Sequence, residues 1–241
     1  MVFVSVFKRN LKELFFRMRA HQVLVPLNAS LLKLHYLIRQ SQWIGKQKRD
    51  AGLNDFYTRG YVFSKMFDLF KFVSENEFKG RAIDYFEFGV FRGNSIKWWL
   101  EDNKQAHSYF YGFDTFKGLP EDFGEFKKGD LSADDRLPEV SDLRCRFYKG
   151  LFQQTLPGFL KSYSGKNPKV LHIDCDLYSS TLFVLCSMAP FLHKGDVLIF
   201  DEFVTPTQEF KAFDDFASAY YLKYELLGAV NNYQQTALKI G

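Results

Sequence analysis

The pattern of apolar and polar positions changes near Gly80. Before it, apolar residues recur at helical spacing over residues 1–19, 24–43 and 56–76, which predicts three helices. After it, short apolar runs rich in β-forming residues predict strands over residues 82–88, 108–113, 144–149, 169–173, 196–200, 224–227 and 234–240. These runs alternate with predicted helices over residues 95–102, 155–163, 179–191 and 208–222. Such alternation predicts βαβ units and a parallel sheet covered by helices on both faces.

The last two predicted strands are joined by a short loop that contains Asn231 and Asn232. This connection leaves no room for a helix, so the two strands should pair antiparallel as a hairpin. The predicted fold is therefore a doubly wound α/β domain with a mostly parallel, seven-stranded sheet that ends in a hairpin. We expect it to occupy residues 56–241, after an N-terminal basic helical extension over residues 1–55.

Composition and charge narrow the classes of protein. The 241 residues are 46% apolar and 18% aromatic, which excludes intrinsic disorder as the main state. Three cysteines without a CxxC pair predict neither a disulfide scaffold nor a zinc ribbon, and they favour a reducing compartment. Residues 1–50 contain ten Lys/Arg and two Asp/Glu residues, a net charge of +8. Residues 51–241 contain 22 Lys/Arg and 26 Asp/Glu residues, a net charge of −4. The acidic body argues against a nucleic-acid partner.

The first predicted helix is basic and amphipathic. Its apolar residues at helical spacing are Phe3, Phe7, Leu11, Leu14 and Met18. The opening apolar run is too short for a signal peptide, so a cytoplasmic protein is expected. Two interpretations of this helix stay open: it packs on the domain or on a twin subunit in a homo-oligomer, or it lies on an anionic membrane surface as a peripheral contact.

Two strand ends carry the marks of a ligand site. Residues 87–95 read E-x-G-x-x-x-G-x-S, in which Gly89 and Gly93 allow a tight turn and close approach of a ligand. Ser95 is expected to cap the following helix, whose N-terminus attracts an anionic group. The next strand ends at Asp114, at the spacing at which a carboxylate binds ribose hydroxyls. Alternatively, Asp114 caps the turn over residues 115–118.

The third strand leads into Gly150, Phe152 and Gln153. The end of the third strand in such folds borders the adenine of a cofactor, where Gln153 would bond its amino edge and Phe152 would stack on it. Alternatively, Thr155 caps the helix and Phe152 lies in the core. The sequence leaves these two interpretations equal.

Four carboxylates follow two strands that should be neighbours. Asp174 and Asp176 come directly after residues 170–173, and Asp201 and Glu202 come directly after residues 197–200. Like charges this close are costly unless a cation or proton intervenes, and hard oxygen ligands suit Mg²⁺ or Ca²⁺. The alternative is a set of solvated loop acids.

Two further residues near these carboxylates have plainer interpretations. His172 lies within the apolar strand, where a core role is more common than a catalytic one. Cys175 has no acid–base partner nearby in the sequence and is interpreted as a small packing residue.

Five motifs in order, FEFGVFRGNS, YGFDTFKGLPE, KGLFQQTLP, DCDLYSST and GDVLIFDEF, resemble the macrocin O-methyltransferase family over about residues 56–241. More distantly, the chain is similar to metal-dependent catechol-type O-methyltransferases. The resemblance implies a class I methyltransferase fold, S-adenosylmethionine as cofactor and a sugar hydroxyl or related small molecule as acceptor. The cofactor contacts that it implies are Glu87, Gly89, Gly93, Asn94, Ser95, Asp114, Thr115, Gly150, Phe152, Gln153 and Asp174.

The resemblance also implies a magnesium site at Asp174, Asp201 and Glu202, although the family usually has DGD and an Asp-Asp pair where this chain has Cys175 and Glu202. Asp174 or Asp176 would take the acceptor's proton, with His172 a further candidate catalytic residue. These departures keep open a non-catalytic, cofactor-binding partner as the alternative function. A nicotinamide dehydrogenase is disfavoured because the chain lacks G-x-G-x-x-G.

Overall fold

The computed structural model describes residues 2–47 and 52–241. The predicted helix over residues 1–19 falls partly outside this description, because Met1 and the side chains of Phe3 and Phe7 are not part of it. The predicted boundary between the extension and the domain, at residues 55 and 56, lies just after residues 48–51, which the structure does not describe. This boundary stays a prediction.

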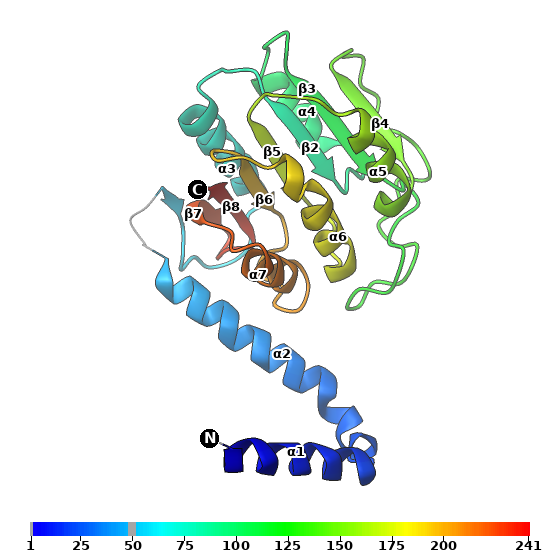
Figure 1. Cartoon of the computed structure of the whole chain (residues 1–241). Helices are drawn as coiled ribbons and strands as arrows, with labels where there is room; N and C mark the ends of the chain where they lie inside the picture. Colours follow the sequence, from blue (N-terminus) through cyan, green and yellow to red (C-terminus); the bar gives the residue numbers. More distant parts are fainter. Residues whose placement is uncertain (1, 48–51) are drawn as a thin grey trace.

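Eight strands form one sheet in the order β1-β7-β8-β6-β5-β2-β3-β4 (Figure 1). Their bounds are β1 Leu53–Asn54, β2 Asp84–Phe88, β3 Tyr109–Asp114, β4 Cys145–Lys149, β5 Lys169–Ile173, β6 Val197–Phe200, β7 Tyr224–Val230 and β8 Gln235–Ile240. β8 runs antiparallel to both β6 and β7, and the other neighbours are parallel. The predicted mostly parallel sheet with a closing hairpin is confirmed, and its two acid-bearing strands, β5 and β6, are neighbours.

The sheet has one strand more than predicted. Leu53 and Asn54 pair with Gly228 and Ala229 of β7, so the extra strand β1 comes from the segment predicted as the extension. Two residues are too few to show the alternation by which a strand is recognised in a sequence.

Helices cover both faces of the sheet. They are α3 Lys65–Val73, α4 Asn94–Asp102, α5 Phe152–Ser162, α6 Tyr178–Met188 and α7 Glu209–Ala219. Successive strand residues point to opposite faces, so Phe86 and Phe88 pack with α5, α6 and α7, whereas Tyr85 packs with α3 and α4.

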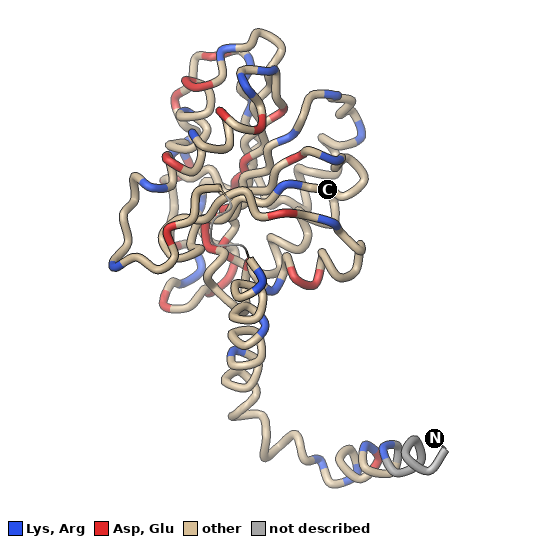
Figure 2. Tube along the Cα trace, turned by 90° about the vertical axis from the view of Figure 1, so that its left-hand side faces the viewer, with Lys and Arg blue, Asp and Glu red and all other residues tan. Residues whose placement is uncertain are grey.

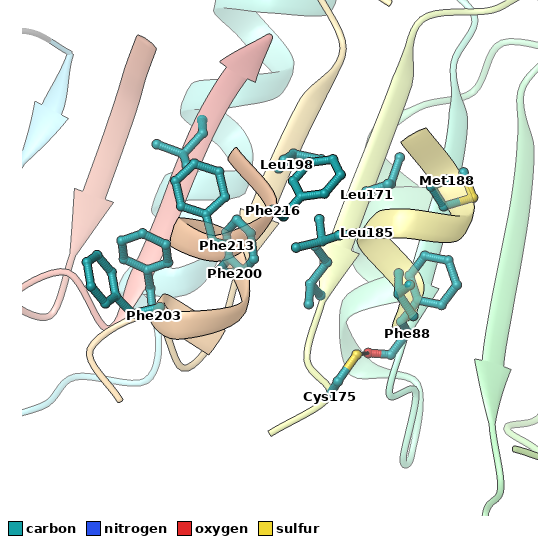
Figure 3. Close-up of a cluster of buried hydrophobic side chains, with 14 of the residues drawn as sticks. Phe88, Leu171, Cys175, Leu185, Met188, Leu198, Phe200, Phe203, Phe213 and Phe216 are labelled. Carbon is teal, nitrogen blue, oxygen red and sulfur yellow. Dashed lines mark hydrogen bonds between the residues drawn. The ribbon is translucent and has the colours of Figure 1, made fainter. Parts of the chain in front are cut away.

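Aromatic rings fill much of the first of these cores (Figure 3). Phe203 contacts Phe200 and Phe213 at centroid distances of 5.2 and 5.6 Å. Cys175 lies in the same cluster, where its thiol donates a hydrogen bond to the carbonyl oxygen of Phe88 at 3.4 Å. Burial raises the pKa of this thiol, which fits a packing role.

The helix predicted over residues 56–76 is shorter in the structure. Helix α3 begins at Lys65, and a π-helical turn over Ser74–Phe78 follows it. The amide groups of Asn231 and Asn232, in the turn between β7 and β8, instead bond the backbone of residues 58–62, which stays non-helical. Asp55 accepts hydrogen bonds from the backbone N–H groups of both asparagines, at 3.0 and 3.1 Å. Tertiary bonds to the hairpin thus replace the predicted helical turns.

Helices α1 Val2–Arg17 and α2 His21–Lys46, together called the N-terminal arm, project from the domain (Figures 1 and 2). Only the later part of α2 touches the domain core, through buried Tyr36, Gln40 and Trp43. Gln40 donates to the carbonyl oxygen of Phe203 at 2.6 Å, and the Trp43 indole donates to the Tyr224 hydroxyl at 2.8 Å. Across the described residues, no helix combines the length and apolar character needed to cross a membrane.

Candidate active site

A cavity of about 190 Å³ opens at the carboxyl ends of the parallel strands. Open α/β sheets bind ligands at this edge. The predicted site residues that line it are Gly89, Asp114, Thr115, Phe152, Gln153, Asp174 and Asp176. Gly150 lines an adjoining cavity. The structure therefore brings together residues from four separate strand ends.

The glycine loop, residues 89–93, follows β2. Gly89 has φ +96°, and a Cβ on it would collide with the carbonyl oxygen of Asp174. The close approach of β2 and β5 at the cavity therefore requires glycine here. The expected Ser95 cap is wrong: α4 begins at Asn94 after Gly93, which has no side chain to cap it, and Ser95 is buried.

Asp114 ties the glycine loop to the end of β3. Its Oδ2 accepts hydrogen bonds from the N–H groups of Val90 and Phe91 at 2.8 and 2.7 Å. Its Oδ1 accepts a bond from the N–H of Phe116 at 2.7 Å, which is the turn cap of the alternative interpretation. Asp114 therefore caps its turn and also lines the cavity.

Two predicted site residues lie on the other face of the sheet. Glu87 is 2% exposed and accepts a hydrogen bond from the Tyr85 hydroxyl at 2.8 Å. The same hydroxyl lies 3.0 Å from Nδ1 of His172, which is fully buried. Burial raises the pKa of Glu87 well above its usual range and lowers the pKa of His172 to about 3. The strand alternation that puts Phe88 at one face puts Glu87 at the other, so neither Glu87 nor His172 lines the cavity.

Phe152 begins α5, directly after β4, which is the third strand predicted from the sequence. The end of this strand therefore does border the cavity. Its ring also contacts Phe88 edge-on, with centroids 5.7 Å apart, so it joins the core and the site together. Thr155 is not the N-terminal cap of α5, because Leu151 occupies the cap position. The Thr155 hydroxyl instead donates a hydrogen bond to the carbonyl oxygen of Leu151 at 3.2 Å.

The four carboxylates predicted from the sequence form an acidic rim: Asp174, Asp176, Asp201 and Glu202. Burial, followed by repulsion from Glu202, raises the pKa of Asp176 to about 7 and that of Asp201 to about 6. Burial and then the charge of Asp201 raise the pKa of Asp174. The rim carboxylates are thus partly desolvated and close enough to repel one another, unlike solvated loop acids.

Glu209 is a fifth acid that sequence reasoning missed. It is fully buried in the first turn of α7, where its Oε2 accepts from the N–H of Glu202 at 2.9 Å. Its Oε1 accepts from the N–H of Cys175 at 3.3 Å, so one side chain holds both acidic loops. An acid in the first turn of a predicted helix is a signal that was available in the sequence.

The predicted magnesium ligands do not assemble into a metal site. Within residues 2–47 and 52–241, no group of three or more His, Cys, Asp or Glu side chains is placed to hold a metal ion. Asp201 Oδ1 instead accepts from the Gln235 amide at 3.1 Å, and Glu202 Oε2 accepts from the Thr205 hydroxyl at 3.1 Å. Their oxygen chemistry nevertheless suits Mg²⁺.

Tyr61 is a second residue that sequence reasoning missed. It belongs to the segment held by Asn231 and Asn232, and it is 56% exposed. Burial of part of its ring, followed by the charge of Asp201, raises the pKa of its phenol. Tyr61 thus lies within electrostatic reach of the acidic rim, at a position that no local sequence pattern indicates.

Comparison with known proteins places this cavity in context. Residues 86–203 match the family model of a methyltransferase domain. The calicheamicin methyltransferase CalS11 superimposes with a TM-score of 0.56 at 20% identity, over 73% of this chain and 77% of that one. The O-methyltransferase NovP gives 0.55 at 20% identity, over 73% and 79%. The chain has the class I methyltransferase fold.

In this methyltransferase fold, β2 lies inside the sheet, between β3 and β5, and the glycine loop follows it. The match to the family model contains the glycine loop, Asp114, Phe152 and Asp174, so every strand end at the cavity lies inside it. Comparison with curated proteins gave no match.

Proposed function

We propose that this protein is an S-adenosylmethionine-dependent O-methyltransferase that methylates a hydroxyl of a sugar or related natural product. The observation that carries the proposal is the cavity itself, where the glycine loop, Asp114 and two rim carboxylates meet within the region that matches a methyltransferase domain. A sugar acceptor is supported by CalS11, which a second structure, at 20% identity and a TM-score of 0.53, describes as TDP-rhamnose 3′-O-methyltransferase.

The cofactor would lie along the glycine loop. The carboxylate of Asp114 has about four acceptor positions, of which backbone N–H groups use three, so one remains for a ribose hydroxyl. Phe152 and Gln153 line the cavity beyond it and would face the adenine. Glu87 is buried and does not line the cavity, so this proposal includes Thr115, which does line it, and leaves Glu87 out.

Methyl transfer needs few chemical groups from the protein. The acceptor oxygen attacks the methyl carbon in line, the carbon–sulfur bond breaks, and its electron pair stays on sulfur, which becomes neutral. The hydroxyl proton passes to a carboxylate. Asp174 and Asp176 are the two rim carboxylates that line the cavity, so we assign this role to one of them.

The acceptor would enter between the rim and Tyr61. Tyr61 is 56% exposed, and partial burial followed by the charges of Asp201, Glu202 and Asp174 raises the pKa of its phenol. A phenol in this place can donate a hydrogen bond to a sugar oxygen while its ring packs on the sugar.

Dependence on Mg²⁺ is a finer proposal that rests on the resemblance and on the oxygen ligands of the rim. No step above uses a metal, because the side chains of Asp201 and Glu202 bond Gln235 and Thr205. Removing divalent metal with a chelator should abolish turnover, and Mg²⁺ should restore it. Full turnover in excess chelator would show that the rim acts without a metal.

Two measurements test the function. Calorimetry with S-adenosylmethionine should show binding, and mass spectrometry of nucleotide-sugar and glycoside acceptors should show the gain of one methyl group. A chain without affinity for the cofactor overturns the proposal. Binding without any methylated product would favour the alternative function, a non-catalytic cofactor-binding partner.

A further inference from the structure

The later part of α2 packs against the segments that carry the acidic rim and Tyr61, which together we call the acceptor side. Three residues of this helix are buried, Tyr36, Gln40 and Trp43. Their spacing of four and three residues puts them on one face of the helix. In Figure 1 this end of α2 lies next to α7. Each of the three contacts a different part of the acceptor side, as follows.

Gln40 is bonded to the loop that follows β6. This loop carries Asp201 and Glu202, and Phe203 comes directly after them. The Gln40 amide donates a hydrogen bond to the carbonyl oxygen of Phe203 at 2.6 Å, and both residues are buried. The N–H of Phe203 donates to the carbonyl oxygen of Gln234 at 2.9 Å, so both backbone groups of Phe203 are bonded. A buried carbonyl group without its donor is costly, so Gln40 helps to fix the backbone beside the rim.

Tyr36 reaches the loop that follows β5 through Asp215 of α7. The Tyr36 hydroxyl donates to Oδ1 of Asp215 at 3.3 Å, and the Tyr178 hydroxyl donates to Oδ2 at 3.2 Å. The ammonium group of Lys211 donates to Oδ2 at 2.7 Å and lies 3.4 Å from the centroid of the Tyr178 ring. Tyr178 begins α6, two residues after Asp176. This network therefore joins α2 to the second acidic loop.

Trp43 contacts the hairpin turn that holds the segment of Tyr61. Its ring packs edge-on against Tyr233 and Phe203, with centroids 5.9 and 5.0 Å apart. Tyr233 follows the two asparagines of this turn, whose amide groups bond the backbone of residues 58–62. One face of α2 thus meets all three segments that make up the acceptor side.

We propose that Gln40 is a positioning residue for methyl transfer, through which α2 fixes the acidic loop after β6. This inference rests on the proposed function. The glycine loop and Asp114, on the cofactor side, are bonded to each other within the domain. Loss of the Gln40 bond should therefore disturb the placement of the acceptor and leave cofactor affinity unchanged. A displacement of about 1 Å at the reacting atoms can lower a rate by about 10²-fold.

The test removes the amide and keeps the length of the side chain. Gln40→Met removes the donor to Phe203, and Gln42→Met, at an exposed position of the same helix, is the matched control. With the nucleotide sugar or glycoside that the full-length protein methylates, kcat/KM for the acceptor should fall at least about tenfold in Gln40→Met. The dissociation constant for S-adenosylmethionine should change by less than about twofold. The control should match the original protein in both, and thermal unfolding checks that each variant is folded at the assay temperature.

Amide hydrogen exchange of the full-length protein adds a measurement that does not depend on activity. In Gln40→Met, peptides over residues 201–207 should exchange faster by about fivefold, whereas peptides over residues 89–95 should not change. Unchanged exchange at residues 201–207, equal effects in the control, or a loss of cofactor affinity as large as the loss of turnover would overturn the inference. If the original protein binds no cofactor and methylates nothing, the proposed function fails. The exchange pattern then still decides whether Gln40 fixes the acidic loop.

Discussion

The acidic rim and the N-terminal arm are built in opposite ways. At the rim, costly side chains are fixed by the scaffold: Glu209 holds the backbone of both acidic loops, and Gln235 bonds Asp201. In the arm, apolar side chains project into solvent, and only one face of α2 is anchored. The comparison shows that energetically unfavourable groups are bonded within the domain in one region and left exposed to solvent in the other. Hydrogen bonds within the domain hold the rim. The arm is attached to the domain only through the later part of α2, among the described residues.

The largest expected effect separates rim chemistry from rim stability. Asp174→Asn should lower turnover by about 10²–10⁴-fold, the usual contribution of a general base. The same change removes a crowded carboxylate whose charged form is disfavoured by burial and by Asp201, so the melting temperature should stay equal or rise. Steady-state kinetics and calorimetric unfolding measure the two effects. A variant with full turnover would remove Asp174 from the proton-accepting role and leave Asp176.

The attachment of the arm is the next test. Trp43→Ala should cost about 3 kcal/mol of unfolding free energy, because it removes a buried ring and the hydrogen bond to Tyr224. The matched change Leu31→Ala, at an exposed position of the same helix, should shift the free energy of unfolding by less than about 0.5 kcal/mol. Urea unfolding measures both. Equal losses at the two positions would contradict an arm anchored on one face.

A smaller effect concerns cofactor affinity. Asp114→Ala should weaken S-adenosylmethionine binding by about 1.5–3 kcal/mol, since it removes a charged acceptor and the two bonds that hold the glycine loop. Calorimetry of the variant gives the value. Unchanged affinity would limit Asp114 to its turn at Phe116.

The smallest of these effects is expected at the glycine loop. Gly89→Ala should cost about 1–3 kcal/mol of unfolding free energy, because residue 89 has φ +96° and the new Cβ meets the carbonyl of Asp174. Gly158 supplies the control. It lies within α5, where an added Cβ would have no heavy atom within 4 Å, so Gly158→Ala should be neutral or stabilising by up to about 1 kcal/mol. If urea unfolding shows the same effect for both changes, close approach is not the reason for glycine at residue 89.

The sequence predicted those parts that depend on local pattern. Alternating apolar runs located all seven long strands, and the bounds of β5 agree residue for residue. The neighbouring acids after β5 and β6 followed from strand order alone. What failed depended on contacts between distant segments. The amide groups of Asn231 and Asn232 replace a predicted helix near residue 60, a preference that no local window contains.

The site was predicted less completely than the fold. Glu87 was placed at the cavity because it precedes the glycine loop, whereas strand alternation turns it to the opposite face. The side chains of Asp201 and Glu202 follow the predicted strand, but Gln235 and Thr205 determine where they point. Such choices depend on partners 34 and three residues away, of which only the nearer is visible in a local motif.

The bonds from the hairpin turn to residues 58–62 have a consequence for synthesis on the ribosome. Translation starts at the N-terminus, and Asn232 lies 174 residues after its hydrogen-bond partner Thr58. Residues 58–62 therefore lack these partners while more than two thirds of the protein is still being translated. The segment that carries Tyr61 therefore gains these bonds only after the final hairpin has emerged. A chain truncated before that hairpin retains the glycine loop and Asp114 but lacks the partners that position Tyr61.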